Sequence, residues 1–260
     1  DGLSTAPIGA GSWTTSYIKQ NVVGRIMVDQ PIGVMYGYDL AGIYQLDDFA
    51  GWQDRTGKLP ANDPAILWQD RNWILKEGIP NAGNLGRLRP GTFKFRNADG
   101  SADQLITEED KVIIGNSQPL FYGGLGNNVS MGPVALSVFF NYSVGAKIFN
   151  STRFELEGAM PGEYFNITRD FWNNRWTPEH PTNAYPAYSD ENYYNSLASL
   201  PNTYYVEDAS FLRLQTVSLS YSLPAKLIAK AGITSAKVYY SGNNLYTFTK
   251  YTGLSPEVDS

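Results

Sequence analysis

The segment ALSVFFNYSVGA, residues 135–146, alternates between two kinds of side chain. Apolar side chains occupy one set of alternate positions: Leu136, Val138, Phe140, Tyr142 and Val144. The residues between them are mostly small or polar: Ala135, Ser137, Phe139, Asn141 and Ser143. A period of two residues is that of a β-strand with one apolar face. That face either packs on a protein core or contacts lipid.

A second segment, 204–224, shows the same alternation. Its apolar positions are Val217, Leu219, Tyr221 and Leu223, and its polar positions are Thr216, Ser218, Ser220 and Ser222. Each of the two segments has a β-rich neighbour across a short connection, which predicts two hairpins. With an earlier Gly- and Tyr-rich stretch, the sequence predicts strands at about 32–44, 119–130, 134–147, 204–222 and 236–250.

The connections between these strands alternate in length. Those at 131–134 and 223–235 are short, whereas those at 46–118 and 149–203 are long and rich in proline and aromatic residues. Outer-membrane barrels combine short periplasmic turns with long extracellular loops, and their strands need about 9–11 residues to span the bilayer. This pattern favours lipid contact for the apolar face and a wet lumen for the Ser/Asn face. A soluble β-sandwich has the same alternation, but turn signals recur every 8–12 residues in a sandwich.

Composition excludes several other classes. The chain has 260 residues, no cysteine, a single histidine and a net charge of −5. Thiolate metal sites, thiol nucleophiles and multi-histidine sites are therefore disfavoured, and so is nucleic acid as a partner. Charged residues make up 17%, below the usual quarter. Paired carboxylates such as Glu108 and Glu109 lack the apolar surroundings of an acid/base pair, so we expect neither an enzyme nor a cofactor.

Several segments together resemble one family. They are ITEEDKVIIGNSQPLFYGGLGNNVS (106–130), LSVFFNYSVGAKIFN (136–150), RWTPEHPTNAYP (175–186), VEDASFLRLQTVSLSYSLP (206–224) and VYYSGNNLYTFTKYTGLSPEV (238–258). In these residues the chain resembles the C-terminal part of the SusC/RagA-type TonB-dependent outer-membrane transporters. The segments follow the family's order and, together with the Gly/Tyr-rich segment PIGVMYGYDLAGIYQ, cover most of residues 31–258.

The resemblance implies an all-β fold, namely an antiparallel transmembrane β-barrel of about 22 strands with a plug inside. This chain would supply about five strands, and the expected extracellular loops are 46–118 and 149–203. The implied function is TonB-dependent import of an oligosaccharide or peptide. The implied partners are outer-membrane lipid, a SusD-like surface lipoprotein that acts as a lid, and TonB–ExbB–ExbD through an N-terminal region not in this chain.

The chain departs from the family pattern because the plug, the TonB box and the last strand do not appear in residues 1–260. Five strands cannot close a lipid-facing barrel, so we expect this chain to be part of a longer or split polypeptide. Two other functions stay open. One is a structural subunit of a larger outer-membrane assembly, and the other is a secreted carbohydrate-binding β-sandwich.

The segment FRNADGSADQLITEED suggests a metal site. Asn97, Asp99, Ser101, Asp103 and Glu108 fall at positions 1, 3, 5, 7 and 12 of an EF-hand-like loop. Ala102 stands where such a loop has its glycine, which weakens the match. We predict a weak calcium site whose ligands are Asn97, Asp99, Asp103 and Glu108; the alternative is a solvated acidic loop.

The long connections are rich in aromatic residues. Aromatic rings with polar edges suit the recognition of sugars, and the candidates for substrate or lid contact are Trp172, Trp176, Tyr185 and Tyr188. The alternative is that these rings pack the loops together. Tyr142, Tyr221 and Tyr240 are instead expected in the aromatic girdles at the two membrane interfaces.

Overall fold

The computed structural model describes residues 23–55, 61–159, 166–188 and 197–257, and these form two compact units. Unit 1 comprises Asp1–Asn116 and Phe149–Val206, and unit 2 comprises Ser117–Ile148 and Glu207–Ser260. The chain passes between the units after Asn116, and again within the short strands β10 (Lys147–Phe149) and β11 (Val206–Asp208), which pair with each other.

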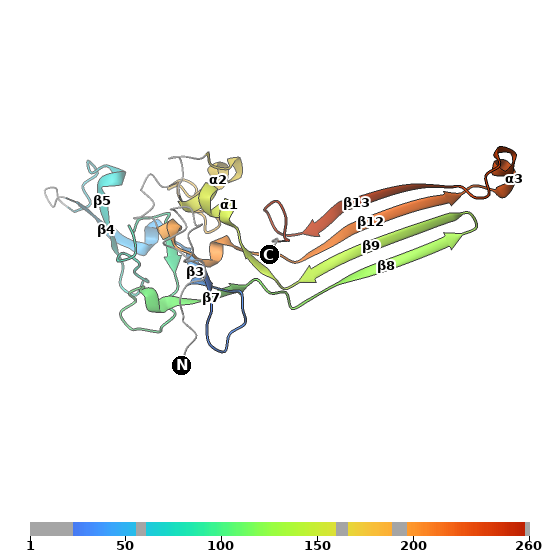
Figure 1. Ribbon diagram of the computed structural model, residues 1–260. Coiled ribbons are helices and arrows are strands. Elements are labelled where there is room, and N and C mark those ends of the chain that lie inside the picture. Colours follow the sequence, from blue (N-terminus) through green and yellow to red (C-terminus); the bar gives the residue numbers. More distant parts are fainter. Residues whose placement is uncertain (1–22, 56–60, 160–165, 189–196, 258–260) are drawn as a thin grey trace, which may run out of the picture. The chain divides into compact units, whose positions relative to one another are not determined.

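Unit 2 is one four-stranded antiparallel sheet of long strands (Figure 1). The strand order is β8 (Phe121–Met131), β9 (Val134–Val144), β12 (Phe211–Ser222) and β13 (Lys237–Thr249). A tight turn with Gly132 at φ 57° joins β8 to β9. The helical turn α3 (Ala225–Ile228), continued by a 3₁₀ turn at Ala229–Ala231, joins β12 to β13.

The register gives this sheet two chemically different faces. Leu136 of β9 lies between Val129 of β8 and Leu219 of β12, whereas the next residue, Ser137, lies between Asn128 and Ser218. Residues that pair across the strands form a row on one face of the sheet. Because successive side chains of a strand point to opposite faces, the rows alternate between an apolar face and a polar face. The apolar face carries Phe121, Leu125, Val129, Leu136, Val138, Phe140, Tyr142, Leu212, Leu214, Val217, Leu219, Tyr221, Val238, Tyr240, Tyr246 and Phe248.

One irregularity keeps the apolar face continuous. Leu214 pairs with Phe140 and Thr216 pairs with Phe139, so Gln215 is an extra residue in β12. A β-bulge of this kind reverses the facing of the residues beyond it. Without it, Leu214 would share a face with Thr216 and Ser218. The bulge therefore places Leu212 and Leu214 on the same side as Val217 and Leu219.

Unit 1 is built from small sheets and short helical turns. Its strands are β1 (Gly24–Arg25), β2 (Val34–Tyr38) and β7 (Lys111–Asn116) in one sheet, β3 (Leu40–Ile43) with β6 (Phe93–Phe95), and β4 (Phe49–Asp54) with β5 (Arg71–Leu75). Its helices are α1 (Ser151–Phe154), followed by a π-helical turn at Glu155–Ala159, and α2 (Arg169–Asn174). Short 3₁₀ turns stand at Leu46–Asp48, Trp68–Asp70, Glu108–Asp110, Leu197–Ser199 and Thr203–Tyr205.

A buried aromatic core holds unit 1 together. The rings of Tyr38 and Phe95 stack with centroids 4.8 Å apart, and Phe93 contacts Tyr204 at 5.0 Å and Tyr205 at 6.1 Å. Tyr38, Phe93, Phe95 and Tyr205 are fully buried. Offset and edge-on aromatic pairs add to the hydrophobic stabilisation. The core thus joins residues that lie as far apart in the sequence as Tyr38 and Tyr205.

The structure confirms the prediction of an antiparallel β fold, but the number and bounds of the strands differ from those predicted. The stretch 32–44 divides into β2 and β3 and belongs to unit 1, where β2 pairs with β1 and β7. Four of the five residues of β2 are buried, so this strand is covered on both faces and lacks the period of a half-buried strand. Four long strands, rather than five, form the open sheet.

The two stretches predicted as long loops are also more structured than expected. Strands β4 to β7 lie within 46–118, and α1 and α2 lie within 149–203. Their strands have only three to six residues, and the segments between them contain proline and glycine. Such short elements leave little periodicity in a sequence.

Candidate functional site: an amphipathic sheet and an aromatic cleft

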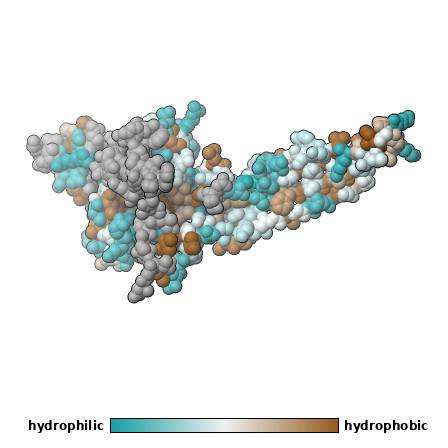
Figure 2. All heavy atoms as spheres, in the orientation of Figure 1, coloured by the Kyte–Doolittle hydropathy of each residue, from teal (hydrophilic) through white to brown (hydrophobic). Residues whose placement is uncertain are grey.

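The apolar face of unit 2 is exposed. Leu125, Val129, Leu219 and Tyr240 have 64%, 50%, 49% and 79% of their surface accessible. Among the described residues of unit 2, no second sheet packs on this face, as the sandwich alternative requires. Soluble proteins rarely expose apolar patches above a few hundred Å². A sheet face lined with exposed apolar side chains is typical of a surface that has an apolar neighbour. Figure 2 shows hydrophobic residues among pale and hydrophilic ones along the side of this sheet that is in view.

Aromatic residues gather toward the two ends of the apolar face. Near one end Tyr142 contacts Phe121 at 6.2 Å between ring centroids, and Tyr246 contacts Phe248 at 4.7 Å. Tyr221 and Tyr240 lie toward the other end, and one row without an aromatic side chain separates the two groups: Asn127, Val138, Val217 and Gly242. Aromatic residues toward both ends of the strands are typical of strands that cross a membrane. The predicted girdle positions Tyr142, Tyr221 and Tyr240 all lie on the apolar face.

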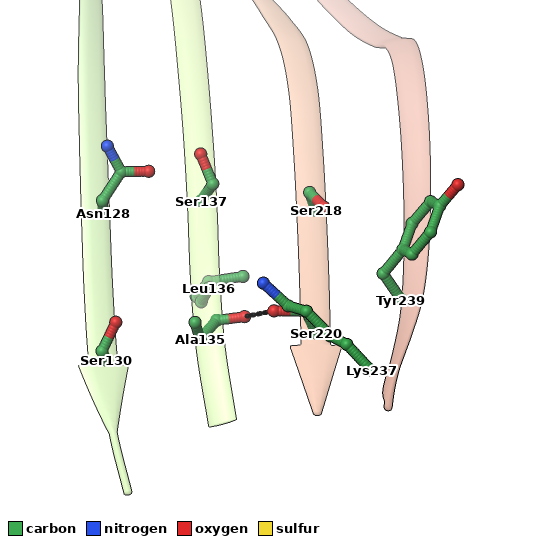
Figure 3. Close-up of a pocket in the computed structure, with 9 residues that line it drawn as sticks. All are labelled: Asn128, Ser130, Ala135, Leu136, Ser137, Ser218, Ser220, Lys237 and Tyr239. Carbon is green, nitrogen blue, oxygen red and sulfur yellow. Dashed lines mark hydrogen bonds between the residues drawn. The ribbon is translucent and has the colours of Figure 1, made fainter. Parts of the chain in front are cut away.

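The opposite face is polar and carries a shallow hollow (Figure 3). Figure 3 shows Asn128, Ser137 and Ser218 in one row across three strands, with Ser130 and Ser220 in the next row. The hollow has a volume of about 330 Å³ and is lined by Asn128, Ser130, Ala135, Leu136, Ser137, Ser218, Ser220, Lys237 and Tyr239. The hydroxyl Oγ of Ser220 donates to the carbonyl oxygen of Ala135 at 3.4 Å. Small hydroxyl and amide groups of this kind suit a face in contact with water.

In unit 1, helix α2 positions one of the aromatic candidates at the surface. Thr168 caps the helix, since its Oγ1 accepts the backbone N–H of Phe171 at 3.1 Å. Phe171 is buried beneath the helix, whereas Trp172 is half exposed. The guanidinium of Arg175 lies 3.5 Å from the centroid of the Trp172 ring, and Tyr188 contacts that ring edge-on at 6.1 Å. Trp172 and Tyr188 are therefore brought together at the surface.

The other two aromatic candidates are tied into the fold. Trp176 is only 3% exposed, and its Nε1–H donates to Oε1 of Gln45 at 2.8 Å. The hydroxyl of Tyr185 donates to Oδ2 of Asp170 at 2.5 Å, and this hydrogen bond raises the pKa of Tyr185. For Trp176 and Tyr185 these contacts favour the packing alternative over direct ligand contact.

A cleft of about 460 Å³ opens beside these residues. Its lining is Trp68, Arg89, Pro90, Arg175, Trp176, Thr177, Pro178, Ala187 and Tyr188. The Trp68 and Trp176 rings lie 6.3 Å apart within it. The sequence singled out Trp176 and Tyr188 but missed Arg89 and Arg175, which no motif marks. Aromatic faces beside guanidinium groups can stack on a ligand and bind its anionic or carbonyl oxygens.

The predicted calcium loop is held by its own hydrogen bonds. Oδ1 of Asn97 accepts the N–H of Gly100, Oδ1 of Asp99 accepts the N–H of Ser101, and Oδ1 of Asp103 accepts the N–H of Leu105. The last of these, helped by the Ser101 hydroxyl, lowers the pKa of Asp103. Within the described ranges, no three acidic, histidine or cysteine side chains gather closely enough for a metal. Calcium binding stays a prediction.

Two further carboxylates explain how this loop is placed. Asp110 is fully buried, and its carboxylate accepts the N–H groups of Ala98, Asp99 and Thr107 at 2.7–3.2 Å. Glu108 instead accepts from the Tyr38 hydroxyl at 3.3 Å and pairs with Lys111. The sequence missed Asp110, although a Thr107–Asp110 capping box is visible as TEED.

Comparisons with known proteins give a consistent picture. No protein family model matches the chain. Among curated proteins, TonB-dependent receptor P26 of Formosa agariphila is 30% identical over 190 residues, which cover 71% of this chain and 18% of that protein. TonB-dependent receptor P3 of the same organism is 29% identical over 230 residues, covering 88% and 19%. The chain thus spans about a fifth of the length of these relatives.

Solved structures show the same fold. The chain matches a component of the RagAB peptide transporter with a TM-score of 0.57 at 21% identity, covering 89% of this chain and 21% of that one. The RagAB peptide importer in its open-open state matches with a TM-score of 0.53 at 23% identity. No described helix is long and apolar enough to cross a membrane.

Proposed function

We propose that this chain, which belongs to the SusC/RagA type of TonB-dependent receptors, forms part of the barrel wall and the outer loops of an importer in the bacterial outer membrane. Unit 2 supplies wall strands whose apolar face contacts lipid and whose Ser/Asn face contacts the aqueous lumen. Unit 1 supplies the extracellular part that meets the cargo.

The observation that carries this proposal is the exposed, two-faced sheet of unit 2. Its strands have 11 to 13 residues, enough to cross the hydrocarbon layer at the usual tilt. The similarity to TonB-dependent receptors is the reason why we propose TonB as the source of energy for import. Import would be driven by TonB–ExbB–ExbD through a part of the polypeptide outside residues 1–260.

The cargo of the proposal is a large nutrient, either an oligosaccharide or a peptide, held beneath a SusD-like surface lipoprotein. The cleft of unit 1 supports this choice, because Trp68 and Tyr188 offer ring faces and Arg175 offers hydrogen-bond donors. Trp172 is half exposed outside that lining, where a lid or cargo can contact it.

The proposal is tested by transport in cells that produce the full-length protein. Uptake of fluorescent peptides and oligosaccharides is measured with and without a functional TonB, and uptake of the true cargo should disappear without TonB. Uptake that continues without TonB, or a protein needed only for the integrity of a surface assembly, would contradict import and favour the scaffold alternative.

A matched pair of variants then tests the loop residues. Trp172→Ala removes an exposed ring and should weaken cargo uptake or lid binding while unit 1 stays folded. Trp176→Ala removes a buried ring with a hydrogen bond to Gln45 and should destabilise unit 1. Equal uptake and lid affinity in the wild type and Trp172→Ala would exclude a role for Trp172.

A further inference from the structure

The connection between β12 and β13 forms an ordered cap at one end of the sheet. α3 and the 3₁₀ turn after it end at Gly232, whose φ is 71°. The N–H of Gly232 bonds to the carbonyl of Ala229 and that of Ile233 to the carbonyl of Ile228, at 3.0 and 3.3 Å. These two bonds make a Schellman motif, which fixes the end of a helix. Figure 1 shows this cap at the tip of the sheet, beside the β8–β9 turn.

The cap exposes apolar side chains although it is ordered. Ile228 is buried under it, but Leu227 is 68% exposed and Ile233 is 46% exposed. The last row of the apolar face, which contains Met131, Val134, Tyr221 and Val238, lies next to the cap and is exposed as well. The cap and the adjoining row of the sheet thus both expose apolar side chains.

The two ends of unit 2 differ in the pairing of their charged side chains. The strands and turns over 121–144 and 211–249 contain no aspartate or glutamate. At the far end from the cap, basic groups have carboxylate partners: Arg213 pairs with Glu257, and Lys147 lies 4.0 Å from Asp208. At the cap end Lys226, Lys230 and Lys237 are exposed, and no ion pair within the described ranges involves them.

The two helical lysines are positioned to act together. Lys226 and Lys230 stand four residues apart across one turn, so their side chains emerge on the same side of the cap. Exposed leucine and isoleucine beside unpaired lysines is the pattern of a segment that lies at the surface of a bilayer containing anionic lipid. Lysine stems can follow the apolar surface while the ammonium groups reach phosphate.

We propose that the cap at 224–237 is a binding surface for anionic phospholipid headgroups at the membrane interface. Lys226 and Lys230 contact lipid phosphate, and Leu227 and Ile233 enter the outer part of the acyl layer. This inference rests on the proposed lipid contact of the sheet and adds a specific headgroup site to it. In the topology expected from the connection lengths, this is the periplasmic side.

Native mass spectrometry of the full-length protein in detergent tests the site. The protein is titrated with phosphatidylglycerol or phosphatidylcholine, and bound lipids are counted. For Lys226→Gln/Lys230→Gln we expect at least about a fivefold loss of phosphatidylglycerol affinity, with unchanged phosphatidylcholine binding. High salt should weaken the wild-type preference. Leu227→Ser should weaken the binding of both lipids.

Lys147→Gln/Lys250→Gln removes the same charge at the other end of the sheet and serves as the control. The site is disproved if the cap variant keeps its phosphatidylglycerol affinity, if the control loses as much, or if wild type binds both lipids equally. Those outcomes leave lipid contact by the sheet intact. An apolar face that proves inaccessible to lipid in the full-length protein would disprove the sheet's role and this site together.

Discussion

The two units of this chain use similar residues in opposite ways. Of the buried hydrophobic residues in the part of the chain that the structure describes, only Ala209, Phe211 and Ile228 lie in unit 2; the others lie in unit 1. Unit 1 hides its aromatic rings in a core of its own. Unit 2 displays its apolar side chains on one face of an open sheet. The difference agrees with the proposed function, in which water surrounds unit 1 and a bilayer contacts one face of unit 2.

The largest effect is expected from emptying the core of unit 1. Phe93 is fully buried and packs on Phe95, Tyr204 and Tyr205. Phe93→Ala should lower the stability of unit 1 by about 3–5 kcal/mol because it removes a ring and leaves a cavity. Hydrogen exchange of the full-length protein, read peptide by peptide, measures the change. Phe248→Ala, at an exposed ring of unit 2, should leave the exchange of unit 1 unaltered.

A charge on either face of the sheet gives the next largest effect. Leu136 and Ser137 are neighbours in β9 and point to opposite faces. Leu136→Lys should destabilise the membrane-inserted protein by about 2–4 kcal/mol, whereas Ser137→Lys should cost much less. Denaturant unfolding in lipid vesicles gives both values. Equal costs would mean that the two faces meet the same solvent.

Alkaline pH should act on unit 1 through its buried tyrosines. Burial raises the pKa values of Tyr38, Tyr44, Tyr204 and Tyr205, with Glu108 adding to the rise at Tyr38. In the unfolded chain tyrosine ionises near pH ~10. The folded state of unit 1 therefore keeps its full stability below about pH 10. That stability is lost as the pH rises above about 10, because the unfolded chain then loses tyrosine protons that the folded state retains.

Proteolysis of unit 1 between pH 8 and 11 follows this loss. Tyr44→Phe removes one titrating hydroxyl, together with its 2.5 Å hydrogen bond to the carbonyl of Pro80, and should flatten the pH dependence. A cleavage rate that does not depend on pH would show that these hydroxyls stay accessible to solvent in the native protein.

Calcium should have the smallest effect. The loop at 97–110 closes on the Asp110 carboxylate by hydrogen bonds to backbone N–H groups. We expect a chelator to shift the Tm of unit 1 by about one degree or less, well under 1 kcal/mol. A drop of several degrees that calcium reverses, and that Asp103→Asn abolishes, would establish the calcium site predicted from the sequence.

The sequence predicted unit 2 better than unit 1 for a physical reason. A sheet with one apolar and one polar face leaves a period of two, and β8, β9 and β13 lie within three residues of their predicted bounds. The predicted strand at 204–222 began too early, since β12 starts at Phe211. The Gln215 bulge was not foreseen, although the apolar alternation shifts by one position between Leu214 and Val217.

Unit 1 depends on contacts between distant residues. The Trp176 indole reaches Gln45 across 131 residues, and the N–H of Ile43 reaches the side chain of Asn183 across 140. No local pattern predicts such pairs. The aromatic content indicated a functional region, but which rings are buried and which are exposed depends on this packing. The arginines of the cleft had no signal at all.

The central claim, that one face of unit 2 meets lipid and the other meets water, is tested most directly by labelling. Residues 1–260 contain no cysteine, so single cysteines at positions 136, 137, 218 and 219 can carry spin labels in the full-length protein with any other cysteines removed. In vesicles, labels at 136 and 219 should be accessible to oxygen dissolved in the bilayer, and labels at 137 and 218 to a water-soluble nickel complex. Labels at 136 and 219 that are shielded from oxygen, or that meet the nickel complex as readily as the other two, would contradict the account.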